Sequence, residues 1–529
     1  MCGIAVATGW DDAVAAVRQL VAGIMHRGDA SDGIMTPRPD AAMATRRLRI
    51  VDAEHATQPM LSADGRVLLA FNGEIYNHLE LRLELARAGV RCRTDSDTEV
   101  LANALSVWGS RAMQRLRGMF AFVALDLRNG DFLAARDPLG IKPLYVIQDG
   151  DGFLFCSEIR PLLNATETGE VMFLPPGHML SRRFCGRYQA ATVAAPRCGA
   201  SRSPAELDRV LREAVESHLP PDLPFALMFS GGVDSTLIAH YARCAQPEAP
   251  GYFLGTRDAP DFPFAASYAE RTGFDLRLVG FDGAGTDIAA LIPDVVAAVE
   301  TFEPSVVREG LCSFLLARRI HADGFRVALG GEGADELFAG YVPLELAFAE
   351  GEAAGEFVRE QCLVDMHRSN LQRIDRCAMR FQLEVRVPFL DPTVTGYALG
   401  LGATALVRNV DGRPRGKMPL REIYDLYPAE LPAAIRDRVK LAQHVGTGFD
   451  RSQTASPWID FAESVLSDRA FEDGRKCFAA YDIGSKEELL YIVALARTMD
   501  IGRVPHLRDR MRLRMPAVRD TAALVPYLA

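Results

Sequence analysis

Several features that would indicate other classes of protein are missing from this chain of 529 residues. Its apolar segments, such as residues 399–407, are too short to span a bilayer. No basic segment followed by an apolar run opens the chain, so we expect no secretion signal and a cytoplasmic location. A net charge of −10 disfavours binding of nucleic acid through a basic surface. We therefore expect neither a membrane nor a nucleic acid as a partner.

Cysteine spacings typical of metal or redox sites are also missing. The ten cysteines are scattered, and none forms a CxxC pair. This usage fits free thiols in a reducing compartment. The hydrophobic content of 49% and charged content of 24% are typical of a globular protein. The length is too great for a single core, so two or three domains are expected.

The most informative residue that is present is Cys2, directly after the initiator methionine. Removal of Met1 would place a thiol and a free α-amino group on one residue. An α-amino group titrates near about 7.7–8.0, so it can act as a general base close to neutral pH. The thiolate that it generates is a nucleophile for amide carbonyls. Taken alone, a cysteine at position 2 is more often a chance occurrence than a nucleophile, so the rest of the chain must decide.

The first part of the chain changes from helical to strand-like periodicity. Helices are predicted at 13–25 and 99–108, and strands at 47–52, 67–71, 119–127 and 132–135. Ser96 or Asp97 is expected to cap the second helix. The strand at 67–71 runs into Asn72-Gly73, a pair that most often forms a turn. Strands predominate after residue 40, which suggests a sandwich of sheets.

Six short motifs occur in order along this part of the chain. They are Cys2-Gly3-Ile4, His26-Arg27-Gly28, Arg47-Leu48-x-Ile50-Val51-Asp52, Asn72-Gly73-Glu74-Ile75-Tyr76-Asn77, Ser96-Asp97-x-Glu99 and Arg136-Asp137-x-Leu139-Gly140. Together they resemble the class II glutamine amidotransferase domain of glutamine-dependent asparagine synthetases. The resemblance implies an α+β N-terminal-nucleophile (αββα) domain over residues 2–190.

The resemblance also implies roles for the motif residues. Cys2 would attack the side-chain amide of glutamine, and the Asn72 side chain with the Gly73 N–H would form the oxyanion hole. Three charged residues would hold the rest of glutamine: Arg47 its carboxylate, and Glu74 and Asp97 its α-amino group. Considered singly, Arg47 or Asp97 could equally be a surface charge.

A second domain is predicted at 205–529, after a linker at 191–204 that is rich in Ser, Arg, Gly and Pro. Ser203-Pro204 begins a predicted helix that ends near His218. An apolar strand at 225–229 then opens into a glycine turn and a helix at 237–244. Glycines allow close approach of a ligand, and a helix N-terminus favours an anion.

The turn after this strand reads Ser-Gly-Gly-Val-Asp-Ser-Thr and resembles the ATP-pyrophosphatase loop. The ending of a Walker A loop, Gly-Lys-Ser/Thr, is missing. The implied reaction cleaves ATP to AMP and pyrophosphate. The residues expected to bind ATP are Ser230, Gly231, Gly232, Asp234, Ser235 and Thr236.

Further strands at 251–255 and 325–329, with a helix at 265–272 between them, predict an α/β doubly wound sheet of the adenine-nucleotide α-hydrolase type. Asp234 and Asp335 follow two of these strands. Carboxylates that face phosphates suggest Mg²⁺, which takes oxygen ligands. The alternative is that both acids only cap helices.

Three later motifs, at 331–341, 384–391 and 416–421, are also similar to those of asparagine synthetases. The resemblance implies that a carboxylate substrate attacks ATP to form an acyl-adenylate. Ammonia from the first site would cross an internal tunnel and displace AMP. Glu332 matches a carboxylate that removes a proton in this step, and burial near phosphates would raise its pKa. Dimers are common among such enzymes, so a homodimer is possible.

The sequence departs from the family pattern around residues 300–311. Arg308 is kept and is expected to bind the acceptor, but Ser305 and Val306 replace two threonines, and Glu309 replaces an alanine. Losing a buried hydrogen bond to substrate can cost over about 1 kcal/mol. We therefore expect a small carboxylic acid other than free aspartate. Glu309 either attracts a cationic amino group or is a solvated surface acid.

A second departure lies at residues 436–448, which resemble the lysine loop of β-lactam synthetases. Lys440 is the predicted cation that stabilises the adenylate, with Arg438 as the alternative. β-Lactam synthetases lack the working cysteine, however, and ring closure needs no ammonia. Cys2 and its partners would then have no task.

The sequence thus favours a glutamine-dependent amide ligase that consumes ATP and acts on a carboxylic acid other than aspartate. The alternatives are a true asparagine synthetase, an enzyme that closes a ring as β-lactam synthetases do, and a catalytically inactive sensor of glutamine or ATP.

Overall fold

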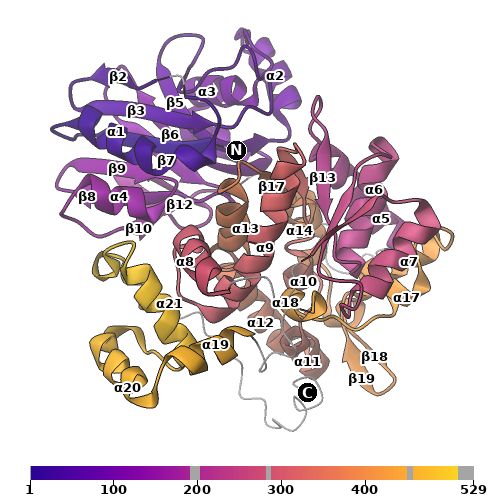
Figure 1. Ribbon diagram of the computed structural model, residues 1–529. Coiled ribbons are helices and arrows are strands. Elements are labelled where there is room, and N and C mark those ends of the chain that lie inside the picture. The colour runs from indigo at the N-terminus through magenta and orange to yellow at the C-terminus, as the bar shows by residue number, and fades with distance from the viewer. Residues whose placement is uncertain (1, 32, 191–202, 281–287, 449–456, 510–529) are drawn as a thin grey trace.

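The computed structural model describes residues 2–31, 33–190, 203–280, 288–448 and 457–509. The chain forms two units that lie side by side (Figure 1). The first runs from β1 to β12, and the second begins with α5 (Pro204–Ser217). Most of the predicted linker at 191–204 lies outside the described residues. The helix expected after it is present, with the Ser203 hydroxyl accepting from the Glu206 N–H.

The first unit contains two antiparallel sheets of six strands each. One has the order β10 (Met172–Phe173), β8 (Tyr145–Asp149), β9 (Gly152–Cys156), β1 (Cys2–Thr8), β3 (Ala41–Arg47) and β2 (Met35–Arg38). The other has the order β12 (Phe184–Arg187), β11 (His178–Ser181), β7 (Phe132–Arg136), β6 (Gly118–Asp126), β5 (Val67–Ile75) and β4 (Met60–Leu61). The predicted sandwich of sheets is therefore present.

Helices cover both outer faces of this sandwich. Because side chains alternate along a strand, Ile4 and Val6 of β1 pack between the sheets, while Ala5 and Ala7 pack outward. The outward side of the first sheet is covered by α1 (Ala13–Gly23) and α4 (Ile159–Ala165), and that of the second by α2 (His78–Arg87) and α3 (Asp97–Trp108). These four layers confirm the predicted αββα fold.

Two local predictions in this unit are wrong. Residues 48–52 form no strand, because β3 ends at Arg47 and the following carbonyls bond to its guanidinium. Asn72-Gly73 is not a turn but lies inside β5. At Gly73 the strands approach so closely that a Cβ would lie 2.0 Å from the Met119 carbonyl oxygen. Its φ of 152° also favours glycine.

The second unit is built on a parallel sheet, as predicted. Its order is β15 (Leu276–Val279), β14 (Gly251–Leu254), β13 (Phe225–Met228), β16 (Val327–Leu329) and β17 (Glu384–Arg386). The chain winds outward from β13 to β15 and then returns to the other side of β13 at β16. The order therefore reverses between β13 and β16, and ligands of doubly wound sheets bind at such a position.

Helices and one hairpin complete the second unit. Around the sheet lie α6 (Val233–Ala245), α7 (Phe262–Thr272), α8 (Ile288–Val299), α9 (Pro304–Ala322), α10 (Ala334–Leu337), α11 (Val342–Glu350), α12 (Glu352–Asp365), α13 (Asn370–Met379) and α14 (Pro392–Leu399). They are followed by α15 (Ala403–Leu406), the hairpin β18 (Arg408–Val410) and β19 (Arg413–Arg415), α16 (Met418–Ile423), α17 (Ala433–Arg436), α18 (Gln443–Gly446), α19 (Pro457–Val465), α20 (Asp468–Cys477) and α21 (Lys486–Ala496).

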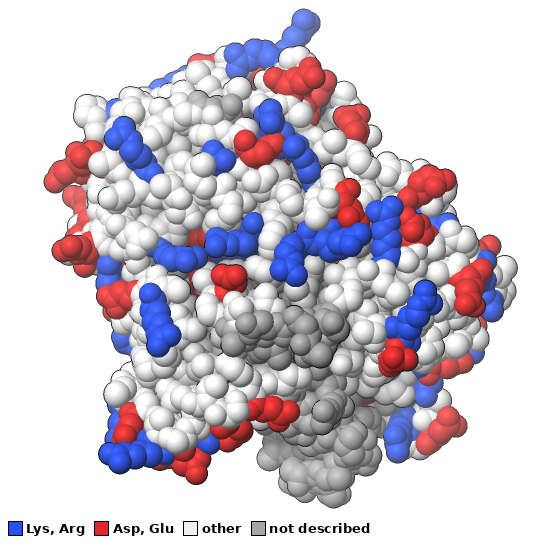
Figure 2. All heavy atoms as spheres, in the orientation of Figure 1, with Lys and Arg blue, Asp and Glu red and all other residues white. Residues whose placement is uncertain are grey.

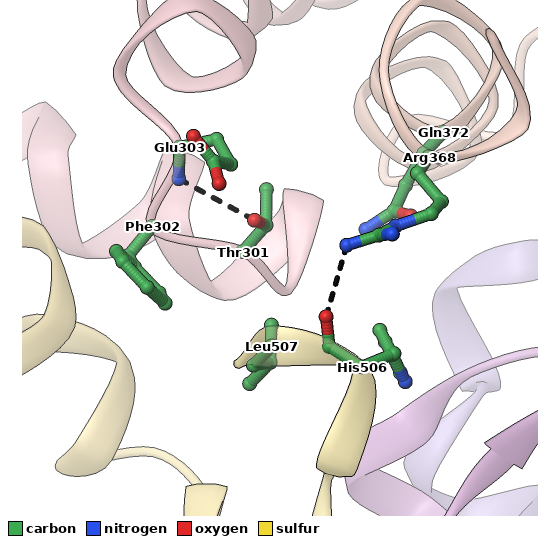
Figure 3. A pocket seen from close by; sticks show the side chains of 7 residues that line it. All are labelled: Thr301, Phe302, Glu303, Arg368, Gln372, His506 and Leu507. Carbon is green, nitrogen blue, oxygen red and sulfur yellow. Dashed lines mark hydrogen bonds between the residues drawn. The ribbon is translucent and has the colours of Figure 1, made fainter. Parts of the chain in front are cut away.

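The C-terminal segment, in which the sequence shows no recognisable motif, connects the two units. The Arg503 guanidinium donates to the carbonyls of Gly169 and Thr166 in the first unit, at 2.8 and 2.7 Å. A short turn after it contacts the second unit, where Arg368 donates to the His506 carbonyl at 2.9 Å (Figure 3). The segment therefore helps to hold the two units together.

The surface carries charges of both signs. On the face shown in Figure 2 they are interspersed, with a row of Lys and Arg across the middle of the molecule. Among the described helices, none combines the length and apolar character needed to cross a membrane.

Candidate active sites

The first site is built around Cys2, where β1 begins between the two units. The Cys2 N–H donates to the Asn72 side-chain oxygen at 2.9 Å. The amide nitrogen of Asn72 is buried and has no hydrogen-bond partner. An unsatisfied buried donor is costly, and here it lies on a residue that contacts the predicted nucleophile. This arrangement leaves a donor available for an oxygen that becomes negative during reaction at the thiol.

The thiol itself is buried, and burial raises the pKa of Cys2. Its sulfur lies 3.5 Å from the side-chain nitrogen of Gln58, which also lies 3.4 Å from the Thr98 hydroxyl. The Gln58 oxygen accepts from the Phe71 N–H at 3.0 Å. Gln58 was not identified from the sequence, since a glutamine before a proline carries no catalytic pattern. The raised pKa means that Cys2 needs a base to become a thiolate.

Arg47 lies directly opposite Cys2 in the pairing of β1 with β3. Its guanidinium is buried and donates to main-chain carbonyls of the following loop, at 3.1 Å for Val51 and 2.9 Å for Asp52. The loop therefore fixes the orientation of the Arg47 guanidinium beside Cys2. Its predicted contact with a glutamine carboxylate stays a prediction.

Two acids lie near the end of β5. Asp97 accepts from the Ile75 N–H at 2.9 Å, and Glu74 lies 3.1 Å from the Arg386 guanidinium of the second unit. Burial raises the pKa of both carboxyl groups, that of Glu74 to about 8 even though Arg386 opposes the shift. A bound cation would lower both pKa values, which is consistent with the predicted α-amino site.

Arg27 belongs to the motif His26-Arg27-Gly28, which by itself indicates no role for it, and the structure shows what it contacts. Its Nε donates to the Cys2 carbonyl at 3.3 Å. The rest of the guanidinium pairs with Glu158 at 3.0 Å and with Asp375 of α13 at 2.9 Å. Arg27 is fully buried, so a single side chain links the main chain of Cys2 to the second unit.

The second site lies where the sheet order reverses. The loop after β13 is tightened by the Ser230 and Ser235 hydroxyls, which lie 3.1 Å apart and both accept from the Gly232 N–H. The loop after β16 is adjacent, since a Cβ on Gly331 would lie 3.2 Å from the Asp234 Cβ. The N-terminus of α6 opens into this space and favours a phosphate there.

The residues predicted to bind ATP differ in accessibility. Gly231 has a φ of 66°, and a Cβ there would lie 2.5 Å from the Ala265 nitrogen, so only glycine fits without rearrangement. Thr236 is fully buried in the first turn of α6. Direct contact of Thr236 with ATP is therefore harder to reconcile with the structure than contact of the residues before it.

The two candidate metal ligands face one cation, Lys417, which the sequence analysis did not single out. Its ammonium forms ion pairs with both Asp234 and Asp335. Although burial opposes the shift, Lys417 and Lys440 lower the pKa of Asp335 to about 2. The signal that could have identified Lys417 is its motif, Gly-Lys-x-Pro-Leu-Arg. Within the described ranges, no cluster of three His, Cys, Asp or Glu side chains could hold a metal ion.

Lys440 and Arg438, the two candidates for the adenylate-stabilising cation, have different surroundings. Lys440 lies 3.1 Å from Asp335, and its side chain is 39% exposed. Arg438 is buried, donates to the Gly231 carbonyl at 2.9 Å and pairs with Asp261. Lys440 can therefore reach a ligand above the carboxylates, whereas Arg438 supports the loop after β13.

The two departures from the family pattern meet in space. Glu309 on α9 lies 3.7 Å from the His444 ring on α18 and 2.6 Å from Arg373. Arg373 also lies 3.2 Å from Glu332. Burial raises the pKa of Glu332, whereas Arg373 and His444 outweigh burial at Glu309 and lower its pKa to about 2. Glu309 is thus not a solvated surface acid.

Arg308 points elsewhere. Its guanidinium makes a two-point ion pair with Glu487 of α21, with its Nε 2.8 Å from one carboxylate oxygen. Consecutive helix residues point about 100° apart, so Arg308 and Glu309 cannot face the same space. The acceptor-binding role of Arg308 remains a prediction, and its observed partner belongs to the C-terminal segment.

Comparison with known proteins agrees with this pair of sites. Residues 1–179 match the family described as glutamine amidotransferase domain, and residues 206–355 and 347–500 match the family described as asparagine synthase. The chain belongs to the asparagine synthase family. The resemblance inferred from the motifs is confirmed, and membership makes the chain an ATP-dependent carbon–nitrogen ligase.

Relatives within the asparagine synthase family include the glutamine-hydrolysing asparagine synthetases of Triphysaria versicolor and Asparagus officinalis. Each is 31% identical over 94% of this chain, covering 86% and 85% of its own length. Among solved structures, glutamine phosphoribosylpyrophosphate amidotransferase from B. subtilis is 18% identical, with a TM-score of 0.32 over 62% of this chain and 81% of that one.

Proposed function

We propose that this enzyme hydrolyses glutamine at the first site and uses the ammonia, with ATP, to convert a carboxylic acid into its amide at the second. The observation that carries the proposal is the Asn72 amide, which accepts from Cys2 through its oxygen and keeps an unpaired buried donor on its nitrogen. A sensor protein would not need a donor prepared for a charge that develops only during reaction.

At the first site, removal of Met1 frees the α-amino group of Cys2 as the base for its thiol. The thiolate attacks the amide carbon of glutamine. The protonated α-amino group passes the thiol proton to the amide nitrogen, and the C–N bond breaks to release ammonia. Water then hydrolyses the thioester to give glutamate and restore the thiol. The Asn72 amide and the Gly73 N–H stabilise the oxyanion, while Arg47, Glu74 and Asp97 hold the α-carboxylate and α-amino group of glutamine.

At the second site, an acceptor carboxylate oxygen attacks the α-phosphorus of ATP, and pyrophosphate leaves. Ammonia then attacks the carbonyl carbon of the acyl-adenylate, and AMP leaves. The loop at 230–235 and the N-terminus of α6 bind the departing pyrophosphate. Lys440 neutralises charge on the adenylate, and Glu332, whose pKa burial raises, accepts a proton from the attacking nitrogen.

The acidic residues fit Mg²⁺ only if the ATP phosphates supply the remaining ligands. One oxygen of Asp234 is buried without a hydrogen-bond partner, and Asp335 faces the same Lys417 ammonium. These two carboxylates would hold the ion, which when bound neutralises charge on the phosphates. Before ATP binds, the positive charge of Lys417 offsets the repulsion between the two carboxylates.

Ammonia would pass between the sites through the contact of the two units. Leu48, Ile50, Met119 and Ile141 of the first unit pack in one buried apolar cluster with residues of the second. An apolar boundary favours the neutral molecule over ammonium. Such a route keeps ammonia from being protonated before it reaches the adenylate.

The acceptor that we propose is a small carboxylic acid other than aspartate. Support comes from the two segments that depart from the family pattern. They meet where Glu309 contacts His444, and this contact lies close to Glu332. Aspartate is the second candidate, favoured because relatives at 31% identity are named asparagine synthetases. Ring closure is disfavoured by the complete set of residues around Cys2.

The proposal is tested by release of pyrophosphate from ATP and Mg²⁺ in the presence of glutamine and a panel of carboxylic acids. We expect one acid to give stoichiometric glutamate, AMP and pyrophosphate, with aspartate at least about tenfold less effective, the effect of one lost polar contact. Equal or better turnover of aspartate would identify an asparagine synthetase. Turnover without glutamine or ammonia would instead indicate ring closure.

Cys2→Ala separates the two half-reactions. We expect it to abolish turnover with glutamine and to leave turnover with ammonium salts intact, because the thiol serves only the first site. Cys156→Ala, a fully buried cysteine of β9 in the same sheet, is the matched control and should keep both activities. Loss of both activities in Cys2→Ala would contradict the proposed division of labour.

A further inference from the structure

Arg386, the last residue of β17, makes two hydrogen bonds and one ion pair through its guanidinium, and the ion-paired nitrogen makes no hydrogen bond. Its Nε donates to Glu384 at 2.6 Å, one terminal nitrogen donates to the His218 carbonyl at 2.9 Å, and the other lies 3.1 Å from Glu74. The side chain is 3% exposed. A buried arginine held by three groups can move only if those groups move with it.

The main chain of the same residue belongs to the second site. Arg386 is paired in register with Leu329, and its carbonyl accepts from the Gly330 N–H at 2.9 Å. Gly330 opens the loop that carries Glu332 and Asp335. One residue therefore holds a glutaminase acid with its side chain and the synthetase loop with its backbone.

A second contact fixes the same segment of the first unit. The Tyr76 ring packs against the His218 ring in a tilted arrangement, with centroids 3.8 Å apart and an angle of 33° between the planes. Glu74 of β5 and Tyr76 just after it thus both contact the second unit. His218 links the two contacts, since its ring packs against Tyr76 and its carbonyl accepts from Arg386. A displacement of the Glu74 carboxylate can therefore be transmitted to β17 through directly contacting side chains.

We propose that Arg386 is a positioning residue that couples binding of glutamine at Glu74 to the arrangement of the loop at 330–335. The inference rests on the proposed glutamine site. The α-ammonium of glutamine would compete with Arg386 for the Glu74 carboxylate. The attraction between Glu74 and the Arg386 guanidinium then weakens, and the guanidinium shifts toward Glu384. The shift passes to Gly330 through the backbone hydrogen bond. Because coupling between ligands is reciprocal, ATP must alter the affinity for glutamine by the same factor.

The test measures KM for glutamine hydrolysis with and without ATP and Mg²⁺, using glutamate release. Wild-type enzyme should show a change of about fivefold or more, the lower end of typical coupling. In Arg386→Gln the ratio should fall to about 1. Arg386→Lys keeps the positive charge but not the three-point geometry, so it should keep part of the ratio.

The pH profile provides a readout that a merely structural role would not move. The charged groups that face Glu74 are Arg386 and Glu384 of β17, Asp97 of α3 and the N-terminal ammonium, which is the same in all the variants compared. Glu74 must be ionised to hold an ammonium, and Arg386 lowers its pKa. The acid limb of kcat/KM for glutamine should therefore move to higher pH in Arg386→Gln and stay in place in Arg386→Lys.

Arg117→Gln is the matched control. It removes an ion pair with Asp391 across the same interface, at 3.5 Å, from a side chain that contacts neither site. This variant should keep the wild-type ratio and profile. An unchanged ratio in Arg386→Gln, no effect of ATP on wild type, or equal loss in Arg117→Gln would overturn the coupling. Complete lack of glutamine hydrolysis by wild type would instead refute the proposed function itself.

Discussion

At the scale of single residues, the first site contains polar side chains that use one hydrogen-bonding group to hold the structure and keep another for the reaction. The Asn72 amide is the clearest case, because its oxygen is used by the Cys2 main chain while its nitrogen has no partner. The motif indicated the residue, but not this division. Gln58 became visible only in three dimensions. The motif around Lys417 was present in the sequence, but only the structure shows that its ammonium pairs with both Asp234 and Asp335.

Asn72→Ala should lower kcat for glutamine hydrolysis by about 10²–10³, with KM little changed, because the lost donor acts mainly in the transition state. Turnover with ammonium salts should persist. Asn103→Ala removes an equally buried asparagine from α3, away from both sites, and serves as the control. A rise in KM without loss of kcat would show that Asn72 binds glutamine instead of the oxyanion.

At the scale of elements, β5 is the strand on which the first site depends. It contains Asn72, Gly73 and Glu74 in succession and continues to Ile75, although Asn-Gly usually marks a turn. The reason lies in its pairing with β6 along its whole length. Local preference for a turn is weaker than the hydrogen bonds and packing of a strand that is buried at every position.

Gly73→Ala should damage β5 and the first site together. The added methyl group would overlap the Met119 carbonyl, so the strands must separate or the variant must lose stability by about 1–3 kcal/mol. We expect a lower Tm and loss of glutamine hydrolysis. Gly65→Ala, in the turn before β5, meets no atoms within 4 Å and tests the effect of a positive φ alone. A Gly73→Ala protein as stable and active as wild type would contradict the close approach.

At the scale of the whole molecule, the two units are less separate than the sequence suggested. Two domains with a linker were expected, yet two of the hydrophobic clusters each contain residues of both units. Buried ion pairs also cross the boundary at Arg27 and Arg386, and the partly buried Arg503 donates across it to main-chain carbonyls. Such an interface is consistent with the proposed passage of ammonia from one site to the other.

Arg27→Met should weaken this interface as a whole. The substitution keeps much of the side-chain volume but removes the buried cation nearest to Glu158 and Asp375. Glu158 then keeps Arg376 at 3.3 Å and Asp375 keeps Lys142 at 3.9 Å, so the expected cost is up to about 3–5 kcal/mol. Calorimetry should show a lower Tm, and more ammonia should escape per pyrophosphate formed. Arg49→Met, whose ion pair with Asp29 is half exposed, should change Tm little. Equal effects of both variants would contradict a special role for Arg27.

The sequence by itself determined the two folds and their order along the chain, and it predicted residues for both sites. Motifs with glycines and acids at set spacings require a particular backbone, and alternating hydrophobicity indicates strands. It could not determine which side chains meet across the two units. The pairing of Glu74 with Arg386, of Arg308 with Glu487 and of Glu309 with His444 joins residues far apart in the chain. Only tertiary packing decides such contacts, because burial forces each charge to find a partner and the fold decides which partner is within reach.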